Sequence, residues 1–174
     1  MTAARRRDEI LQALAGASGP VSAAALAARL GVSRQVVVGD VALLRAAGSP
    51  IVATPRGYVL GGGQEGGGVR CTVACRHGLD GLLDELYTVA DCGCGVLDVT
   101  VEHPVYGQLS GQLQVLSRYD ADVFWDALQK NGAQPLCSLT GDIHLHTLVC
   151  PDEARKARVL AALEEKGYLM GLEK

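Results

Sequence analysis

The sequence predicts an α+β protein with two domains. The first 60 residues follow a helical pattern that ends in two short strands, whereas residues 69–174 alternate strands with helices. Between them, residues 61–68 read GGGQEGGG, a composition typical of a flexible linker. Of the 174 residues, 48% are hydrophobic, which is enough for each domain to bury a core. We therefore expect domains at 1–60 and 69–174, joined by a linker at 61–68.

Composition excludes several classes of protein. No apolar run reaches the roughly 20 residues that span a bilayer. The N-terminal arginines are not followed by the apolar core of a signal peptide, so secretion is not expected. The six cysteines are then better interpreted as thiols than as a disulfide framework. We expect a cytoplasmic protein with no membrane partner.

The first domain begins with three predicted helices. An apolar stripe behind the N-terminal arginines predicts the first helix. It is expected to end at residues 17–20, which contain a glycine and a proline. Ser22 is predicted to cap a helix over residues 23–30, and Ser33 to cap another that runs from residue 34 to about 47. Two of these helices are therefore separated only by a short turn.

A predicted hairpin follows the helices. Residues 51–54 and 57–60 have the pattern of short strands, and Arg56 lies in the tight turn between them. Two helices, a three-residue turn containing Gly31, a third helix and a hairpin are the order of a winged helix-turn-helix. The first domain is therefore predicted to have this fold.

Charge and residue type point to DNA as the partner of this domain. Residues 1–60 carry seven basic and three acidic residues, net +4, whereas the remainder carries nine and sixteen, net −7. Arg and Gln at the start of a recognition helix pair with guanine and adenine edges, and Ser contacts phosphate. A small helical interaction domain with solvated arginines is the alternative. The candidate DNA contacts are Ser22, Ser33, Arg34, Gln35 and Arg56.

The second domain has the predicted order βαββαβαβ, an α+β sandwich with helices over one sheet. Pro151 is expected at the first position of the last helix, and residues 168–172 as a final strand. The remaining strands are predicted over residues 69–76, 96–101, 105–116 and 142–150, and the helices over residues 78–90, 119–130 and 152–166.

The sequence His144-Leu145-His146 is the strongest chemical signal in this domain. On a strand the two imidazoles lie on one face, roughly 7 Å apart, and such a pair can share a divalent metal ion. The apolar residues Ile143, Leu145 and Val149 are then expected to face the core. A polar sheet face with two titratable histidines is the alternative.

Other polar residues leave their roles open. His77 ends the first strand of this domain, and Glu85 lies eight residues later, but their spacing alone does not identify a pair, and Asp84 competes with Glu85. His103, held extended by the proline that follows it, either lines a ligand pocket or occupies a turn.

The cysteines give only a weak metal signal. Cys92 and Cys94 form a single Cys-x-Cys pair with no second pair at suitable spacing, and Cys71 and Cys75 share strand parity. Buried cysteines usually pack as small hydrophobic residues. A cysteine metal site is therefore not expected.

Taken together, these motifs resemble the nicotinate-responsive repressors of NAD biosynthesis, in which a winged helix-turn-helix precedes a three-histidine (3H) domain. The resemblance covers nearly the whole chain in order. It rests on residues 34–48 and 51–60, on His77 with Glu85, and on the segments 101–107, 138–141 and 144–146.

The resemblance implies a metal-containing sensor. In the family, the matching residues bind one divalent transition metal ion, nickel or zinc-like, so the expected ligands are His77, Glu85, His144 and His146. The effector is nicotinic acid, a corepressor whose carboxylate or pyridine nitrogen could occupy an open coordination position. Family members are homodimers, which suits a palindromic operator because one winged domain reads only a short site.

The resemblance also implies what the chain regulates. We expect a repressor of NAD biosynthesis or niacin uptake genes, with the effector near His103 and Tyr106. Two departures stand out: Gly39 lies inside the recognition helix, where it costs about 1 kcal/mol relative to Ala, and Cys92 and Cys94 enrich one loop.

Three alternatives differ from this expectation. In a metal-responsive repressor the ion itself would be the signal. An enzyme could activate water on an open metal site, but the sequence shows no convincing general base, and a DNA-binding domain precedes the site. A bifunctional biotin ligase and repressor uses a similar N-terminal domain, but the second domain is too short and lacks an adenylate loop. We therefore expect a regulator and not an enzyme.

Overall fold

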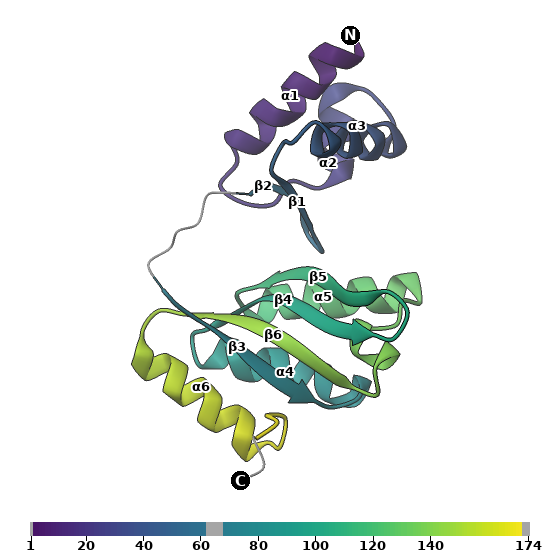
Figure 1. The fold of residues 1–174 in the computed structure, drawn as a ribbon. Helices are drawn as coiled ribbons and strands as arrows, with labels where there is room; N and C mark the ends of the chain where they lie inside the picture. Colours follow the sequence, from purple (N-terminus) through teal and green to yellow (C-terminus); the bar gives the residue numbers. More distant parts are fainter. Residues whose placement is uncertain (1, 62–67, 172–174) are drawn as a thin grey trace. The chain divides into compact units, whose positions relative to one another are not determined.

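The computed structural model describes residues 2–61 and 68–171, in two compact units whose boundary falls within the predicted linker (Figure 1). Residues 62–67 of that linker lie outside the described residues. In the part of the chain that is described, no helix has the length and apolar character needed to cross a membrane.

Three helices form most of the first unit: α1 (Ala3–Ala15), α2 (Ala23–Leu30) and α3 (Arg34–Ala46). The starts of α2 and α3 follow the predicted caps. The hydroxyl of Ser22 accepts a hydrogen bond from the amide of Ala25 at 3.0 Å, and that of Ser33 accepts one from Val36 at 3.3 Å. Gly31 ends α2 with a φ of 65°, in the left-handed region that glycine adopts without strain.

The wing consists of β1 (Ile51–Thr54) and β2 (Gly57–Leu60), paired antiparallel. The main chain of Tyr58 also exchanges two hydrogen bonds, each 2.9 Å long, with Val21 before α2. This third segment of the wing was not predicted, because it depends on pairing between residues far apart in the sequence. The helices and wing enclose a core of Ile10, Ala13, Leu14, Leu26, Ala27, Leu30, Val37, Val41, Leu44 and Ile51.

The second unit is a four-stranded antiparallel sheet with helices. Its strand order is β3-β6-β4-β5, so β6 and β4 are the central strands. In chain order its elements are β3 (Val69–Arg76), α4 (Leu79–Asp91), β4 (Gly95–His103), β5 (Gly107–Val115), α5 (Arg118–Asn131), a 3-10 helix η1 (Leu136–Leu139), β6 (Ile143–Cys150) and α6 (Glu153–Glu165).

The helices α4, α5 and α6 cover one face of this sheet (Figure 1). The hydrophobic core lies between the two layers, and it includes Val73 and Cys75 of β3, Leu86 and Val89 of α4, and Val159 and Leu163 of α6. The predicted layering of this domain is therefore confirmed.

The orientation of β6 was predicted wrongly. His144, His146, Leu148 and Cys150 point into the covered face, whereas the side chains of Ile143 and Leu145 are 42% and 37% exposed. The alternation itself is as expected, but the histidines and not Ile143 and Leu145 face the core. The physical reason is a buried partner for the imidazoles, described below.

Details at three helix and strand ends also differ from expectation. Asp152 caps α6 by accepting a hydrogen bond from the amide of Arg155, so Pro151 precedes the cap and is not the first helical residue. The predicted strand over residues 168–172 is reduced to a single bridge between Leu169 and Cys75, and its last residue lies outside the described range. Leu79, which would be expected on the apolar side of the predicted helix over residues 78–90, is 44% exposed.

Candidate functional site

Glu85 is a carboxylate on the buried face of α4. It lies with Leu82, Leu86 and Val89 on the stripe of α4 that packs on the sheet. Glu85 is only 1% exposed. A buried charge in an apolar stripe is costly unless it has partners. The neighbouring strands supply them.

Three imidazoles converge on one oxygen of this carboxylate. The Nε2 atoms lie from Glu85 Oε2 at 2.6 Å for His77, 3.5 Å for His144 and 3.2 Å for His146. His77 directly follows β3, and the other two lie on the adjacent strand β6. Pairing between β3 and β6 therefore brings together residues that are almost 70 positions apart in the sequence.

Each imidazole is held by its other nitrogen. All three Nδ1 atoms lie within hydrogen-bonding distance of main-chain carbonyl oxygens, at 2.9 Å for His77 and Gly78, 3.0 Å for His144 and Asp142, and 2.7 Å for His146 and Asp98. A carbonyl only accepts hydrogen bonds, so each Nδ1 carries the proton and donates. In a neutral ring this leaves the Nε2 lone pair directed at the shared point, an arrangement common in metal sites.

Local backbone features place two of these carbonyl groups. The pairing register of β4 shifts between Val96 and Asp98, a bulge beside His146. Before β6, Gly141 and Asp142 both have positive φ, 63° and 70°. Asp142 is one of two described non-glycine residues with this conformation, which is uncommon outside glycine and is often found at functional sites.

The electrostatics show that these groups are strongly coupled. Burial alone would lower the pKa of His77 and His146, but the hydrogen bonds and negative charge of Glu85 outweigh it, so both pKa values are raised. For Glu85, burial would raise the pKa, but the charge of His146 and the hydrogen bonds from the histidines hold it well below its usual range. The carboxylate of Glu85 thus stabilises positive charge on the rings of His77 and His146.

The donor set suits a divalent metal ion. Zinc–nitrogen and zinc–oxygen bonds are about 2.0 to 2.2 Å long, which places ligand atoms roughly 3 to 3.5 Å from one another. The Nε2 to Oε2 distances of His144 and His146, 3.5 and 3.2 Å, lie in this range, whereas that of His77, 2.6 Å, is a hydrogen-bonding distance and would lengthen around an ion. The second oxygen of Glu85, Oε1, is buried without a hydrogen-bond partner among the described residues, as expected of a carboxylate that has a further ligand to receive.

A cavity adjoins the site on the side of α5 and η1. It is small, with a volume of about 30 Å³. Apart from the four polar residues, its walls are mostly apolar, formed by Leu82, Leu86, Val99, Leu113, Phe124, Pro135, Leu136 and Cys137. Apolar walls with a few polar groups at one end are typical of sites for small ligands, but a ligand with an aromatic ring would enter only if these walls move apart.

His103 and Tyr106 are not brought to this cavity. They lie at the turn between β4 and β5, where Tyr106 is 74% exposed and their rings are 4.9 Å apart. His103 Nδ1 accepts hydrogen bonds from the amides of Val105 and Tyr106, both at 3.2 Å. His103 is the last residue of β4, directly before this turn.

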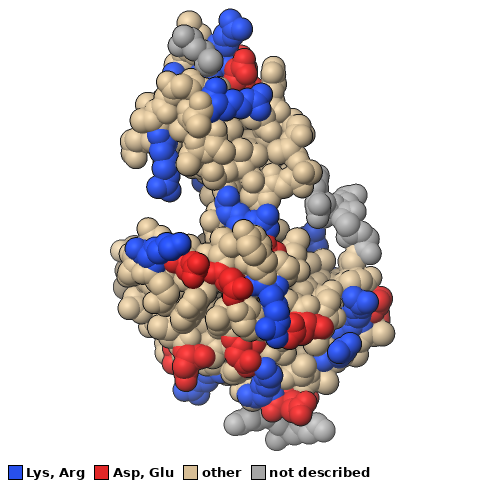
Figure 2. Space-filling model, turned by 180° about the vertical axis from the view of Figure 1, so that it is seen from behind, with Lys and Arg blue, Asp and Glu red and all other residues tan. Residues whose placement is uncertain are grey.

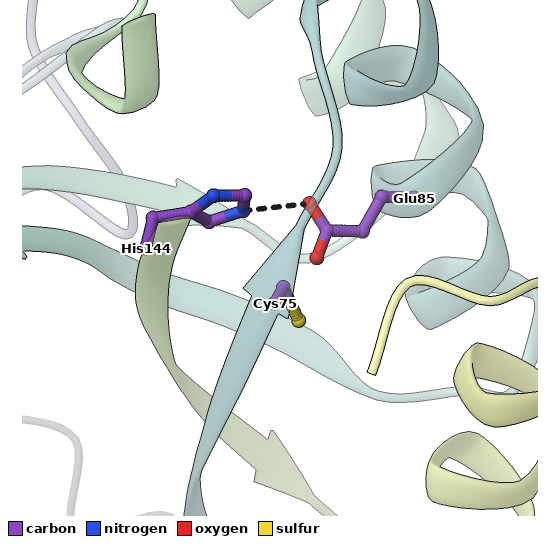
Figure 3. A group of neighbouring side chains, drawn as sticks. All are labelled: Cys75, Glu85 and His144. Carbon is purple, nitrogen blue, oxygen red and sulfur yellow. Dashed lines mark hydrogen bonds and ion pairs between the residues drawn. The ribbon is translucent and has the colours of Figure 1, made fainter. Parts of the chain in front are cut away.

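Asp84, the sequence competitor of Glu85, points elsewhere. It pairs with Lys166 at 2.8 Å and accepts a hydrogen bond from the hydroxyl of Tyr168 at 2.8 Å. Sequence reasoning missed Cys75, which is fully buried beside Glu85 and His144 (Figure 3). The sequence did contain a signal for it. Cys75 on β3 lies two residues before His77, and residues two apart along a strand point to the same face of the sheet.

Cys92 and Cys94 do not join this site. Both are buried at the end of α4 and in the following turn, and Cys94 Sγ contacts the carbonyl oxygens of Cys92 and Arg155 at 3.9 and 3.7 Å. Burial raises the pKa of the Cys94 thiol. The pair therefore packs in the core.

The helix-turn-helix presents the predicted DNA contacts at its surface. Arg34 and Gln35 are exposed in the first turn of α3, and Arg56 is exposed at the tip of the wing. Ser22 and Ser33 use their hydroxyl oxygens to cap α2 and α3. Their oxygens also lie at helix N-termini, where phosphate groups bind readily.

Part of the basic charge has a structural role. Arg6 Nε lies 2.5 Å from Asp40 Oδ2, and Arg7 lies 3.6 Å from the other carboxylate oxygen. Asp40 is 3% exposed, so these pairs tie α1 to α3. The exposed basic surface consequently depends more on the remaining arginines. On the face drawn in Figure 2, charged side chains of the first unit are mainly basic, whereas both signs mingle on the second.

Comparison with known proteins agrees with this arrangement. A family described as an HTH domain matches residues 6–59, and the 3H domain family matches residues 70–172. A probable transcription repressor NiaR of Thermotoga maritima is 43% identical over 165 residues, covering 95% of this chain and 93% of the relative. The transcription repressor NadR of Bacillus subtilis is 40% identical over 169 residues, covering 96% and 94%.

The chain belongs to the NiaR and NadR family of transcription repressors. Its members are regulators and not enzymes. Each domain match lies within one of the two structural units, and the cluster of histidines and Glu85 lies wholly within the 3H domain.

Proposed function

We propose that this chain represses genes of NAD biosynthesis or niacin uptake by binding a palindromic operator as a homodimer, with nicotinic acid as corepressor and one divalent transition metal ion in each 3H domain. Imidazole ligands suit zinc, nickel, copper and iron, and the family resemblance favours nickel or zinc among them. The observation that carries the proposal is the convergence of three Nε2 atoms on Glu85 Oε2 at the wall of an apolar cavity.

The protein's own groups define how an ion would be held. His77, Glu85, His144 and His146 present their donor atoms inward, and the main-chain carbonyls fix the rings. When bound, the ion supplies a Lewis-acidic position for a carboxylate or a pyridine nitrogen. The apolar cavity walls, with Phe124 and Leu136 among them, would pack against the flat ring of nicotinate once they move apart to admit it.

The origin of the ligands supports a regulatory role. They come from the end of β3, from α4 and from β6, so occupation of the site ties these elements together. An effector influences DNA binding only if it favours the DNA-competent arrangement, because equal affinity for both arrangements shifts nothing. Nicotinate is therefore expected to bind more tightly to the operator-bound protein than to the free protein.

A metal-responsive repressor is the second candidate. One observation favours it: the four donor residues form a set that requires no group from an effector. In this case, the metal ion alone would raise operator affinity, and nicotinate would add nothing.

Operator binding measured by fluorescence anisotropy tests both candidates. The labelled operator is titrated with protein that has been stripped of metal, reloaded with zinc or nickel, or reloaded in the presence of nicotinate. Nicotinamide, which lacks the carboxylate, is the matched control. Tighter binding only with metal and nicotinate together supports the corepressor. A full response to metal alone supports the second candidate, and a full nicotinate response in metal-free protein contradicts the metal-dependent sensor.

A further inference from the structure

Cys75 is a thiol among the proposed metal ligands. It is fully buried on β3 and lies directly opposite His144 on β6 in the pairing register, so both side chains enter the same covered face of the sheet. Cys75 Sγ, one oxygen of Glu85 and one ring nitrogen of His144 all lie within 4.8 Å of one another. Figure 3 shows His144 and Glu85 pointing toward each other, with the side chain of Cys75 beside them.

The charge of the site provides an independent argument. Three neutral imidazoles and one carboxylate would leave a divalent ion with a net charge of +1. Glu85, His144 and His146 are 1%, 2% and 5% exposed, so water screens this charge poorly. A buried net charge is unfavourable unless it is compensated. One thiolate would make the centre neutral, and Cys75 is the thiol within reach of both Glu85 and His144.

We infer that Cys75 is a further ligand of the metal ion, which makes the centre a mixed site of imidazole, carboxylate and thiolate. The inference rests on the proposed metal-binding function. When the ion binds, the S–H bond of Cys75 breaks, the sulfur keeps the electron pair and bonds the metal, and the proton passes to solvent. A thiolate favours borderline and soft ions such as zinc and cobalt over manganese and magnesium.

A simpler role for Cys75 makes a different prediction. A thiol that only packs in the core, or donates a weak hydrogen bond to Glu85, would stay protonated and outside the coordination sphere. In that case the metal would have only nitrogen and oxygen neighbours. The sulfur–metal bond is therefore the property to measure.

Titration of the full-length, metal-stripped protein with cobalt(II) chloride gives a direct readout. A sulfur-to-cobalt charge-transfer band is expected in the near ultraviolet, saturating at one cobalt per chain. Cys75→Ser should lose this band and keep the visible cobalt absorption that comes from the remaining ligands. It should bind cobalt and zinc at least about 10-fold more weakly, because changes around a metal site typically cost that much affinity. Its preference for zinc over manganese should also fall.

Cys137→Ser is the matched control, because Cys137 is another buried cysteine in the cavity wall. This variant should keep the charge-transfer band. If the wild type binds one cobalt without the band, or Cys75→Ser retains it, the inference is overturned while the proposed function stands. If the wild type binds no metal ion at all, the proposed metal site fails, and this inference fails with it.

X-ray absorption of the wild-type zinc protein provides a test that needs no variant and is unaffected if Cys75→Ser folds poorly. One sulfur neighbour at about 2.3 Å, beside nitrogen and oxygen neighbours near 2.0 Å, is the expected result. A first shell of nitrogen and oxygen alone would exclude Cys75 as a ligand.

Discussion

The Nδ1 atom of His146 lies 2.7 Å from the carbonyl oxygen of Asp98 on the neighbouring strand. The side chain of Asp98 also accepts a hydrogen bond from the amide of Thr147 at 3.1 Å, so one residue fixes both the backbone and the ring at this point of β6. The β4 bulge places it there. The ring of His146 is therefore oriented before any ligand arrives, with its Nε2 directed at Glu85.

Removal of both β6 histidines should abolish metal binding. The double variant His144→Ala with His146→Ala takes away two of the four proposed donors and leaves Glu85 with one imidazole partner, so elemental analysis should show no bound metal ion. Nicotinate-dependent operator binding should weaken, whereas weak nonspecific DNA binding should remain. His103→Ala is the control, because His103 lies at a turn away from the cavity. Stoichiometric metal in the double variant would contradict the ligand assignment.

The local parts of the fold were predictable, and the long-range parts were not. Ser22, Gly31 and Ser33 mark helix ends through hydrogen bonds and backbone conformations confined to a few residues, so α2 and the start of α3 lie where expected. The bridge between Val21 and Tyr58 depends on contacts across the domain. No short sequence pattern contains such information.

The site was predictable only in part for the same reason. Spacing placed His144 and His146 on one face of a strand, but alternation cannot tell which face is covered, and apolarity misassigned Leu145 to the core. The pairing of β3 with β6 and the packing of α4 decide which face is buried. His77 and Glu85 were expected through family resemblance, and Cys75 becomes a candidate only when its cross-strand partner is known.

Two glycine-to-alanine substitutions should have different effects, one on zinc affinity and the other on the stability of the first domain. A β-carbon at Gly81 would lie 2.9 Å from His77 Cβ, closer than real contacts allow, whereas one at Gly39 would meet nothing within 4 Å. Gly81→Ala should displace His77 and weaken zinc binding by about 10- to 100-fold, the range seen when support of a ligand is lost. Gly39→Ala should raise the free energy of unfolding of the first domain by about 1 kcal/mol, because alanine favours a helix.

Zinc titration with a chromophoric competitor and thermal unfolding measure these two effects. Each variant serves as the control for the other, since both place alanine in a helix. Unchanged zinc affinity in Gly81→Ala would show that His77 is not held by this contact. A lower melting temperature in Gly39→Ala would show that the glycine has a packing role.

Metal affinity should fall as the pH is lowered. The carboxylate of Glu85 raises the pKa of His77 and His146, so these rings hold protons at a higher pH than free histidine, whose pKa is about 6.5. A metal ion must displace these protons, and the loss of affinity should therefore begin above pH 6.5. Once both rings are protonated, zinc affinity should fall by about 100-fold per pH unit.

Isothermal titration calorimetry in buffers of different ionisation enthalpy measures this linkage, because the number of protons released appears in the heat of binding. Release close to two protons from the histidines is expected near pH 6, in addition to any thiol proton. A zinc affinity that is constant between pH 8 and pH 6 would contradict the assignment of His77 and His146 as ligands.

The chain should be a dimer in solution. One winged domain of about 60 residues reads a site too short for genomic specificity, and a two-fold dimer on a palindromic operator is the simplest remedy. The 3H domain must supply the interface, since a glycine-rich linker buries little area. Analytical ultracentrifugation at micromolar concentration should show a dimer. A monomer, both with and without operator DNA, would contradict the proposed assembly.

The recognition helix and the wing should contribute differently to DNA binding. Arg34 and Gln35 are exposed at the start of α3, where side chains reach base edges, so Arg34→Ala should cost about 1–3 kcal/mol on the operator and relax specificity at one position. Arg56 lies at the exposed wing tip. If it contacts the backbone or a minor groove, Arg56→Ala should weaken binding to all sequences similarly and reduce the dependence of affinity on salt.

Anisotropy titrations with operator and scrambled DNA at several salt concentrations separate the two effects. Arg45→Ala, at the other end of α3, is the control for loss of charge alone. Unchanged operator affinity in the double variant Arg34→Ala with Gln35→Ala would rule out docking of α3 through its first turn.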